Sequence, residues 1–91
     1  MPSEHDREVR RKVRKLEREG WSVKADLPDY EMPSPIGKYD RIPDIEATKP
    51  GSRRIIEVEG EKIDKEQIRS FMQSARMRPR TKFILIKTTK K

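Results

Sequence analysis

The segment from residue 42 to residue 60, IPDIEATKPGSRRIIEVEG, constrains the fold more than any other part of the chain. A tight turn is predicted at residues 49–52, where proline and glycine stand together between polar neighbours. Residues 54–59 then have the β-branched content and the alternation that are typical of a strand. We therefore expect a hairpin that closes at Gly51, and the rest of the chain to be arranged around it.

Such a hairpin would bring three carboxylates together, those of Asp44, Glu57 and Glu59. Like charges that lie close to one another raise each other's pKa unless a cation intervenes. Oxygen-rich acidic sites suit hard divalent ions such as Mg²⁺ or Mn²⁺, and such an ion activates water and neutralises charge on a phosphate under attack. The alternative is that these acids form a strand face that only contacts solvent. The Pro43-Asp44 pair before the first strand of the hairpin makes this the weaker interpretation.

The chain has 91 residues, of which 31% are hydrophobic, so we expect residues 1–91 to form a single domain with a thin core. A homodimer would bury more apolar surface. The sequence has no cysteine, which excludes disulfides and thiolate metal sites. No apolar run is long enough to cross a membrane and no signal peptide is recognised, so a cytoplasmic protein without a membrane partner is expected.

The net charge of +7 is concentrated at the C-terminal end. Residues 1–75 carry 16 basic and 16 acidic residues, whereas residues 76–91 carry seven basic residues and no acid. A basic patch on a chain that is otherwise neutral favours a polyanionic partner, most simply nucleic acid. The alternative is a tail that only increases solubility. The cations expected to contact phosphate are Lys38, Arg41, Arg69, Arg76, Arg78, Arg80 and Lys82.

The N-terminal half is predicted to hold a helix, a strand and a long loop. The helix covers residues 4–19, with Ser3 as its N-cap and Gly20 as its stop signal. Apolar and polar side chains alternate over residues 21–27, which indicates a half-buried strand with Trp21 in the core. Residues 28–43 contain several prolines and are expected to form a long connection.

A second helix is predicted over residues 65–76, with Asp64 as its N-cap and Gln67 completing a capping box. Its expected buried face consists of Ile68, Phe71, Met72 and Ala75. Residues 82–87 hold an unbroken apolar run, which is typical of a strand covered on both faces. Residues 88–91 are expected to be a frayed tail.

The order of elements is therefore helix, strand, strand, strand, helix, strand. A crossover helix between the last two strands predicts that those strands are parallel. The first three strands can form an antiparallel meander. The expected fold class is α/β with a mixed four-stranded sheet.

This order, together with Pro43-Asp44, twelve intervening residues and then Glu57-Val58-Glu59, resembles the PD-(D/E)-x-K nuclease superfamily. The layout is most similar to archaeal Holliday-junction resolvases and RecB-like nuclease domains. The resemblance implies a minimal restriction-endonuclease-like core and a magnesium- or manganese-dependent endonuclease acting on DNA rather than RNA, including structured or branched DNA. It also implies that Asp44 and Glu57 are the metal-binding carboxylates.

Further positions are carried over from the resemblance. The family often adds a glutamate from the first helix, for which Glu8 is the expected residue and Glu4 the alternative. RecB-like members carry a Gln-x-x-x-Tyr motif after the third strand. The segment from Gln67 to Phe71 matches it with phenylalanine in place of tyrosine, which gives Gln67 an auxiliary role.

One departure from the family concerns Glu59, which stands where a lysine is usual. A glutamate supplies no positive charge, but it can serve as a third metal ligand or as a general base toward a metal-bound water. Lys62 or Lys87 is a candidate to replace the missing cation. The competing hypotheses are a nucleic-acid-binding module that keeps the fold without catalysis, favoured by Glu59, and an interaction subunit of a larger complex.

Overall fold

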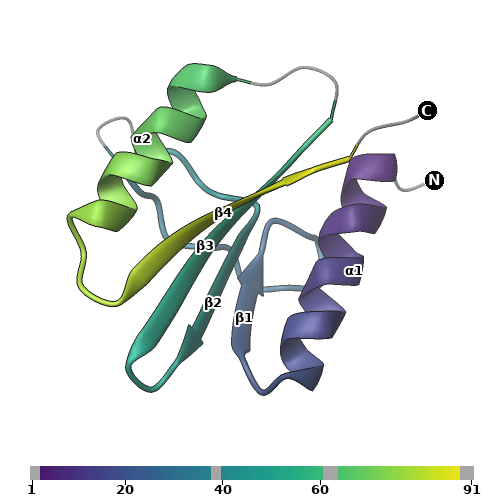
Figure 1. Ribbon diagram of the computed structural model, residues 1–91. Coiled ribbons are helices and arrows are strands. Elements are labelled where there is room, and N and C mark those ends of the chain that lie inside the picture. The colour runs from purple at the N-terminus through teal and green to yellow at the C-terminus, as the bar shows by residue number, and fades with distance from the viewer. Residues whose placement is uncertain (1–2, 38–39, 61–63, 89–91) are drawn as a thin grey trace.

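The fold is an α/β arrangement of two helices and a four-stranded sheet (Figure 1). The computed structural model describes residues 3–37, 40–60 and 64–88. In chain order the elements are α1 (Glu4–Arg18), β1 (Ser22–Ala25), β2 (Ile45–Lys49), β3 (Ser52–Glu59), α2 (Lys65–Arg76) and β4 (Thr81–Lys87). The strands lie side by side in the order β1-β2-β3-β4, with the first three antiparallel and β4 parallel to β3. The predicted fold class and mixed sheet are confirmed.

Both helices begin at the predicted caps. The Ser3 hydroxyl accepts a hydrogen bond from the Asp6 backbone N–H at 3.1 Å, and α1 ends just before Gly20, which adopts a φ of +91°. The Asp64 carboxylate accepts from the backbone N–H of Gln67 at 3.0 Å. Among the described residues, neither helix is long and apolar enough to span a membrane.

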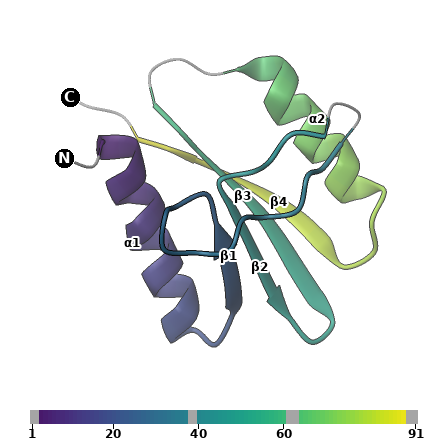
Figure 2. The same cartoon turned by 180° about the vertical axis from the view of Figure 1, so that it is seen from behind.

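The sheet separates two apolar clusters, one under each helix (Figure 2). The larger cluster joins α1 to β1, β2 and β3, and it includes Trp21, which is 8% exposed and lies in the core as predicted. The smaller cluster lies under α2, where the rings of Phe71 and Phe83 stand 6.1 Å apart. Each face of the sheet is thus covered by one helix, and β3 contributes to both clusters, with Ile56 and Val58 on the side of α1 and Ile55 on the side of α2.

The strand predicted over residues 21–27 is shorter in the structure, because β1 ends at Ala25. The chain turns back beyond that point, and the backbone N–H of Ala25 donates to the carbonyl of Glu31 at 3.0 Å. Trp21 and Leu27, which flank the strand, are nevertheless buried on the side that the alternation predicts.

The long connection over residues 28–43 is partly built into the fold. Ile36 and Arg41 form an isolated antiparallel bridge, and Ile36 is buried in the cluster under α2. The Ser34 backbone N–H donates to Glu46 at 2.9 Å, and Glu46 also pairs with Arg53 at 2.6 Å. Glu46 of β2 therefore links this segment to the sheet through its hydrogen bond with Ser34.

Two predictions about burial are wrong in part. Met72 is 42% exposed, although the helical spacing places it on the buried face of α2. The apolar residues of β4 contact both clusters but are only half-buried, because β4 is the outermost strand and has a neighbour on one side only. Thr88 is held by the chain rather than frayed, since its N–H donates to the carbonyl of Glu59 at 2.8 Å; residues 89–91 lie outside the described residues.

We expect Phe71→Ala to lower the free energy of unfolding by about 3–5 kcal/mol, because it empties the centre of the smaller cluster. Met72→Ala, one position along the same helix, should cost only about 0.5 kcal/mol or less, since that side chain is largely exposed. Urea unfolding followed by the fluorescence of Trp21 measures both. Equal losses in the two variants would contradict the assignment of this core.

Candidate functional site

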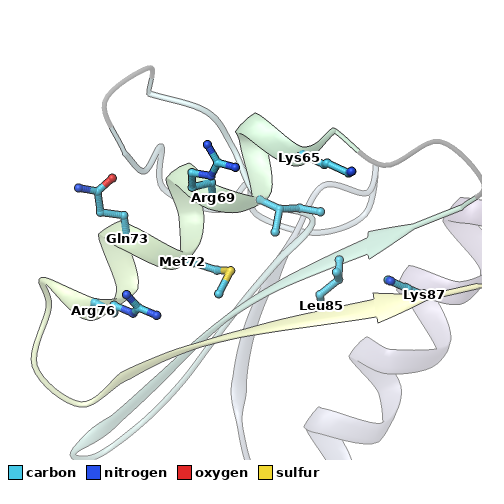
Figure 3. Close-up of a pocket in the computed structure, with 8 residues that line it drawn as sticks. Lys65, Arg69, Met72, Gln73, Arg76, Leu85 and Lys87 are labelled. Atoms are coloured by element: carbon cyan, nitrogen blue, oxygen red, sulfur yellow. The ribbon is translucent and has the colours of Figure 1, made fainter.

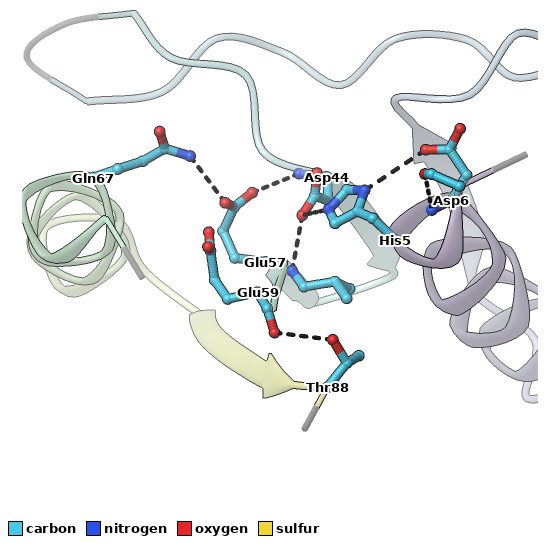
Figure 4. A network of polar contacts seen from close by, with 9 residues as sticks. His5, Asp6, Asp44, Glu57, Glu59, Gln67 and Thr88 are labelled. Atoms are coloured by element: carbon cyan, nitrogen blue, oxygen red, sulfur yellow. Dashed lines mark hydrogen bonds and ion pairs between the residues drawn. The ribbon is translucent and has the colours of Figure 1, made fainter. Parts of the chain in front are cut away.

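The open end of the β2–β3 hairpin brings Asp44 and Glu57 together. The two strands pair from Lys49 opposite Ser52 to Ile45 opposite Ile56, so Asp44 comes next in register with Glu57. The Asp44 backbone N–H donates to Glu57 Oε1 at 2.8 Å, and the Val58 N–H donates to Asp44 Oδ2 at 2.8 Å. These reciprocal hydrogen bonds fix the two carboxylates at the open end of this central hairpin (Figure 4).

Glu57 is buried, with 2% of its surface exposed, and both of its carboxylate oxygens accept hydrogen bonds. Its Oε2 accepts from Gln67 Nε2 at 2.9 Å, and Gln67 Oε1 in turn accepts from Arg41 Nη1 at 2.7 Å. The side chain of Gln67 therefore turns toward Glu57 and Arg41 rather than completing the predicted capping box. The sequence suggested both roles, and the structure selects the contact with Glu57.

The pKa of Glu57 is raised to about 8, first by burial, then by the charge of Asp44 and by the hydrogen bond and charge of Glu59, which together outweigh the lowering effect of the hydrogen bond from the Asp44 N–H. The carboxyl group is therefore largely protonated near neutral pH. A divalent cation beside it would favour the ionised form and lower this pKa.

Sequence reasoning assigned no role to His5, yet His5 contacts the site. Its Nε2 lies 3.2 Å from Asp44 Oδ2, and its Nδ1 lies 3.6 Å from Asp6 (Figure 4). Partial burial lowers the pKa of His5, but the charge of Asp44 and the hydrogen bonds to Asp44 and Asp6 outweigh it and raise the pKa above 6.5. The contact spans 39 positions of sequence, so no local pattern could have revealed it.

The remaining predicted acids are placed differently. Glu59 lies two residues beyond Glu57 on the same strand, and its side chain hydrogen-bonds to that of Glu57. Glu8, the expected acid of the first helix, pairs with Arg11 at 3.6 Å, and no hydrogen bond or ion pair joins it to Asp44 or Glu57. From α1, His5 reaches Asp44.

The donor chemistry of this site suits a divalent ion, but its present arrangement is closed. In residues 3–37, 40–60 and 64–88 no group of three or more histidine, cysteine, aspartate or glutamate side chains is spaced to hold a metal. Both oxygens of Glu57 and Oδ2 of Asp44 accept hydrogen bonds from the protein. Ion binding therefore requires Glu57 to lose its proton and the carboxylates to exchange some of these hydrogen bonds for the ion.

The predicted phosphate-binding cations that the structure describes are distributed over four regions. Arg41 lies beside the site, where it also pairs with Asp64 at 3.3 Å. Arg69 and Arg76 line a groove between α2 and β4, while Arg78 and Arg80 border a cavity at the β2–β3 turn. Lys82 is in register with Arg54 on the face covered by α1. Lys38 lies outside the described residues.

Lys87 is the cation of β4 that is nearest in register to the acids. It is the register partner of Glu59 on the adjacent strand, so both side chains emerge on the sheet face covered by α2. Lys62, the other candidate to supply the missing positive charge, lies outside the described residues.

Comparison of the chain with protein-family models, with curated proteins and with solved structures finds no match. The function must therefore be argued from the site.

The raised pKa of Glu57 predicts that stability falls with rising pH between 4.5 and about 8, because over this range the folded state binds a proton that the unfolded state has lost. Glu57→Gln removes the titrating group, so the free energy of unfolding should depend less on pH. The altered hydrogen bonds change the free energy of unfolding by the same amount at every pH and do not affect this comparison. Urea unfolding at pH 5 and pH 8 compares the slopes of the two proteins. Parallel slopes would show that Glu57 titrates normally.

The contact of His5 with Asp44 predicts that Asp44→Asn lowers the pKa of His5, since it removes the largest of the favourable interactions. A matched change, Asp6→Asn, should lower the pKa less. Because the sequence contains a single histidine, NMR titration of its ring protons follows one signal. Protonation of His5 stabilises the fold below pH 6.5, and this contribution is lost as the pH rises through the folded-state pKa. An unchanged pKa in Asp44→Asn would refute the contact.

Proposed function

We propose that this protein is a metal-dependent nuclease that hydrolyses phosphodiester bonds in DNA, including structured or branched DNA, on a minimal restriction-endonuclease-like core. The observation that supports it most is the pairing of Asp44 with Glu57 at the open end of a hairpin, with twelve residues between them in sequence. The raised pKa of Glu57 has burial as its main cause and the neighbouring acids Asp44 and Glu59 as further causes. A divalent cation beside these carboxylates would favour their ionised forms.

The residues divide into those that hold the ion and those that position others. Asp44 and Glu57 would bind Mg²⁺ or Mn²⁺, with Glu59 and His5 beside them; when bound, the ion supplies Lewis-acid stabilisation of the phosphate and a more acidic water. Gln67 orients Glu57 by donating to Oε2, and its own orientation is set by Arg41. Gln67 is therefore a positioning residue.

The glutamate at position 59 is compatible with this proposal because the positive charge can come from another strand. Lys87 occupies the register position beside Glu59 on β4, so its ammonium group is available to a phosphate at the sheet edge. Glu59 then takes the part of a general base or of a further ligand.

The alternative is a nucleic-acid-binding module without catalysis. It is favoured by the closed state of the site, in which both oxygens of Glu57 already accept hydrogen bonds. Such a module would bind DNA with strong salt dependence and without regard to divalent ions.

The nuclease proposal predicts Mg²⁺- or Mn²⁺-dependent cleavage within a panel of four-way junctions, flaps, single strands and linear duplexes. Asp44→Ala and Glu57→Gln should each lower the rate by at least about 100-fold, because each removes a group in direct contact with the ion. Glu66→Gln, which neutralises an exposed acid in the first turn of α2, is the matched control and should cleave at the wild-type rate. Cleavage that persists in purified Asp44→Ala would sink this site assignment.

A Mn²⁺ titration followed by NMR separates the two functions without a choice of substrate. The nuclease proposal predicts selective broadening of the amide signals of residues 44 and 57–59, which is lost in Asp44→Asn. DNA binding by a protein whose spectrum and affinity ignore Mn²⁺ would support the non-catalytic module.

A further inference from the structure

A groove runs between α2 and β4 on the sheet face that also carries the acids. Its lining encloses about 590 Å³ and consists of Lys65, Ile68, Arg69, Met72, Gln73, Arg76, Leu85 and Lys87 (Figure 3). The residues come from the exposed side of α2 and from the outermost strand of the sheet, so the groove opens to solvent along its length. It is separate from the contacts of Asp44 and Glu57 described above.

The rim of the groove is uniformly basic. Four of its eight lining residues are cations, and none is acidic. Lys65, Arg69 and Arg76 project from one helix, and Lys87 faces them from β4 (Figure 3). A polyanion is therefore the occupant with complementary charge.

The floor of the groove is apolar. Met72 and Leu85 point into the space between helix and strand, and Ile68 lies beside them in the lining. Met72 is 42% exposed, an unusual position for a methionine that the helical spacing places on the buried face. The polyanion must therefore also present apolar surface, which a phosphate backbone alone does not.

One end of the groove meets the candidate metal site. Lys87 of the lining is in register with Glu59 on the adjacent strand, and both side chains lie on the sheet face covered by α2. Arg76 marks the opposite end, at the last residue of α2. A strand of nucleic acid lying in the groove would thus lead directly to the acids.

We propose that this groove binds an unpaired strand of nucleic acid and delivers it to the carboxylates, an inference that rests on the proposed nuclease function. In a duplex the base faces are stacked on one another and are not available to an apolar floor. In an unpaired strand they are free, and aliphatic side chains such as those of isoleucine, leucine and methionine pack against unstacked bases. The substrate is therefore DNA with a single-stranded segment next to the scissile phosphate.

The groove also sets the length of that segment. Eleven helical steps separate Lys65 from Arg76, which at about 1.5 Å per residue is roughly 16 Å. At about 3.4 Å per nucleotide for stacked bases, and more for unstacked ones, the groove takes at most about five nucleotides.

Binding is measured without divalent ions, by fluorescence anisotropy of a labelled 12-nucleotide single strand and of the blunt duplex of the same sequence. We expect the single strand to bind more tightly. Arg69→Gln with Arg76→Gln should weaken single-strand binding by about tenfold and reduce its salt slope by about 1.4, the value for two lost phosphate contacts. Met72→Ala, which changes no charge, should weaken single-strand binding while leaving duplex affinity unchanged, since only free bases reach the floor.

The matched control is Lys15→Gln with Arg18→Gln, which removes two exposed charges from the last turn of α1, on the other face of the sheet. An equal loss in the control would show that the groove acts only through net charge and would overturn the inference. Preference for the duplex would do the same. So would groove variants that bind the oligonucleotide normally but lose a peptide of alternating glutamate and leucine, because the groove would then be a protein-docking surface.

The groove and the nuclease proposal can fail separately. Metal-dependent cleavage that is unaffected by the groove variants, on substrates with an unpaired segment, would refute the groove and leave the nuclease in place. Single-strand binding that depends on the groove, in a protein that cleaves nothing with Mg²⁺ or Mn²⁺, would refute the nuclease and leave the groove.

Discussion

Two short hydrogen bonds between the start of β2 and the end of β3 determine how the rest of this small protein is arranged. They join the Asp44 N–H to Glu57 and the Val58 N–H to Asp44, so each acid satisfies a backbone donor of the other strand. Beyond the last paired residues of the hairpin, the two carboxylates therefore accept hydrogen bonds from the backbone N–H groups of Asp44 and Val58. Both helices contact this pair from their first turns, α1 through His5 and Asp44 and α2 through Gln67 and Glu57.

The same pair carries an electrostatic cost. A carboxyl group that is 2% exposed beside another acid is held in its protonated form near neutral pH, and ionising it works against folding. A chain with a thin core has little stability to spare for such a group. Strained or repulsive arrangements of this kind persist where a ligand relieves them, which is consistent with a site that acquires a cation.

The sequence predicted the parts of the fold that depend on local chemistry. Both N-caps and the turn at Gly51 follow from residue types within a few positions of one another, and the parallel pairing of β4 follows from the helix that connects it to β3. Contacts between distant segments could not be predicted from the sequence, since His5 lies 39 positions from Asp44. Helical spacing likewise could not show that Met72 faces an open groove beside β4 and is therefore exposed. Gln67 is an intermediate case, because the sequence allowed both a capping box and an auxiliary role at the site. The hydrogen bond from its side chain to Glu57 decides between the two.

The exposed edge of β4 shows how the charge pattern limits what this surface can bind. An outer strand with a run of half-buried apolar residues is a template for pairing with a second chain. Here Lys82 and Lys87 stand at either end of that run, and antiparallel pairing of two copies brings the lysines at opposite ends of the two strands near one another. The repulsion disfavours self-association through β4 and favours a polyanion along the same edge. The basic residues that accompany the apolar strand therefore disfavour its pairing with a second copy, and they match the charge of the nucleic acid proposed as the ligand.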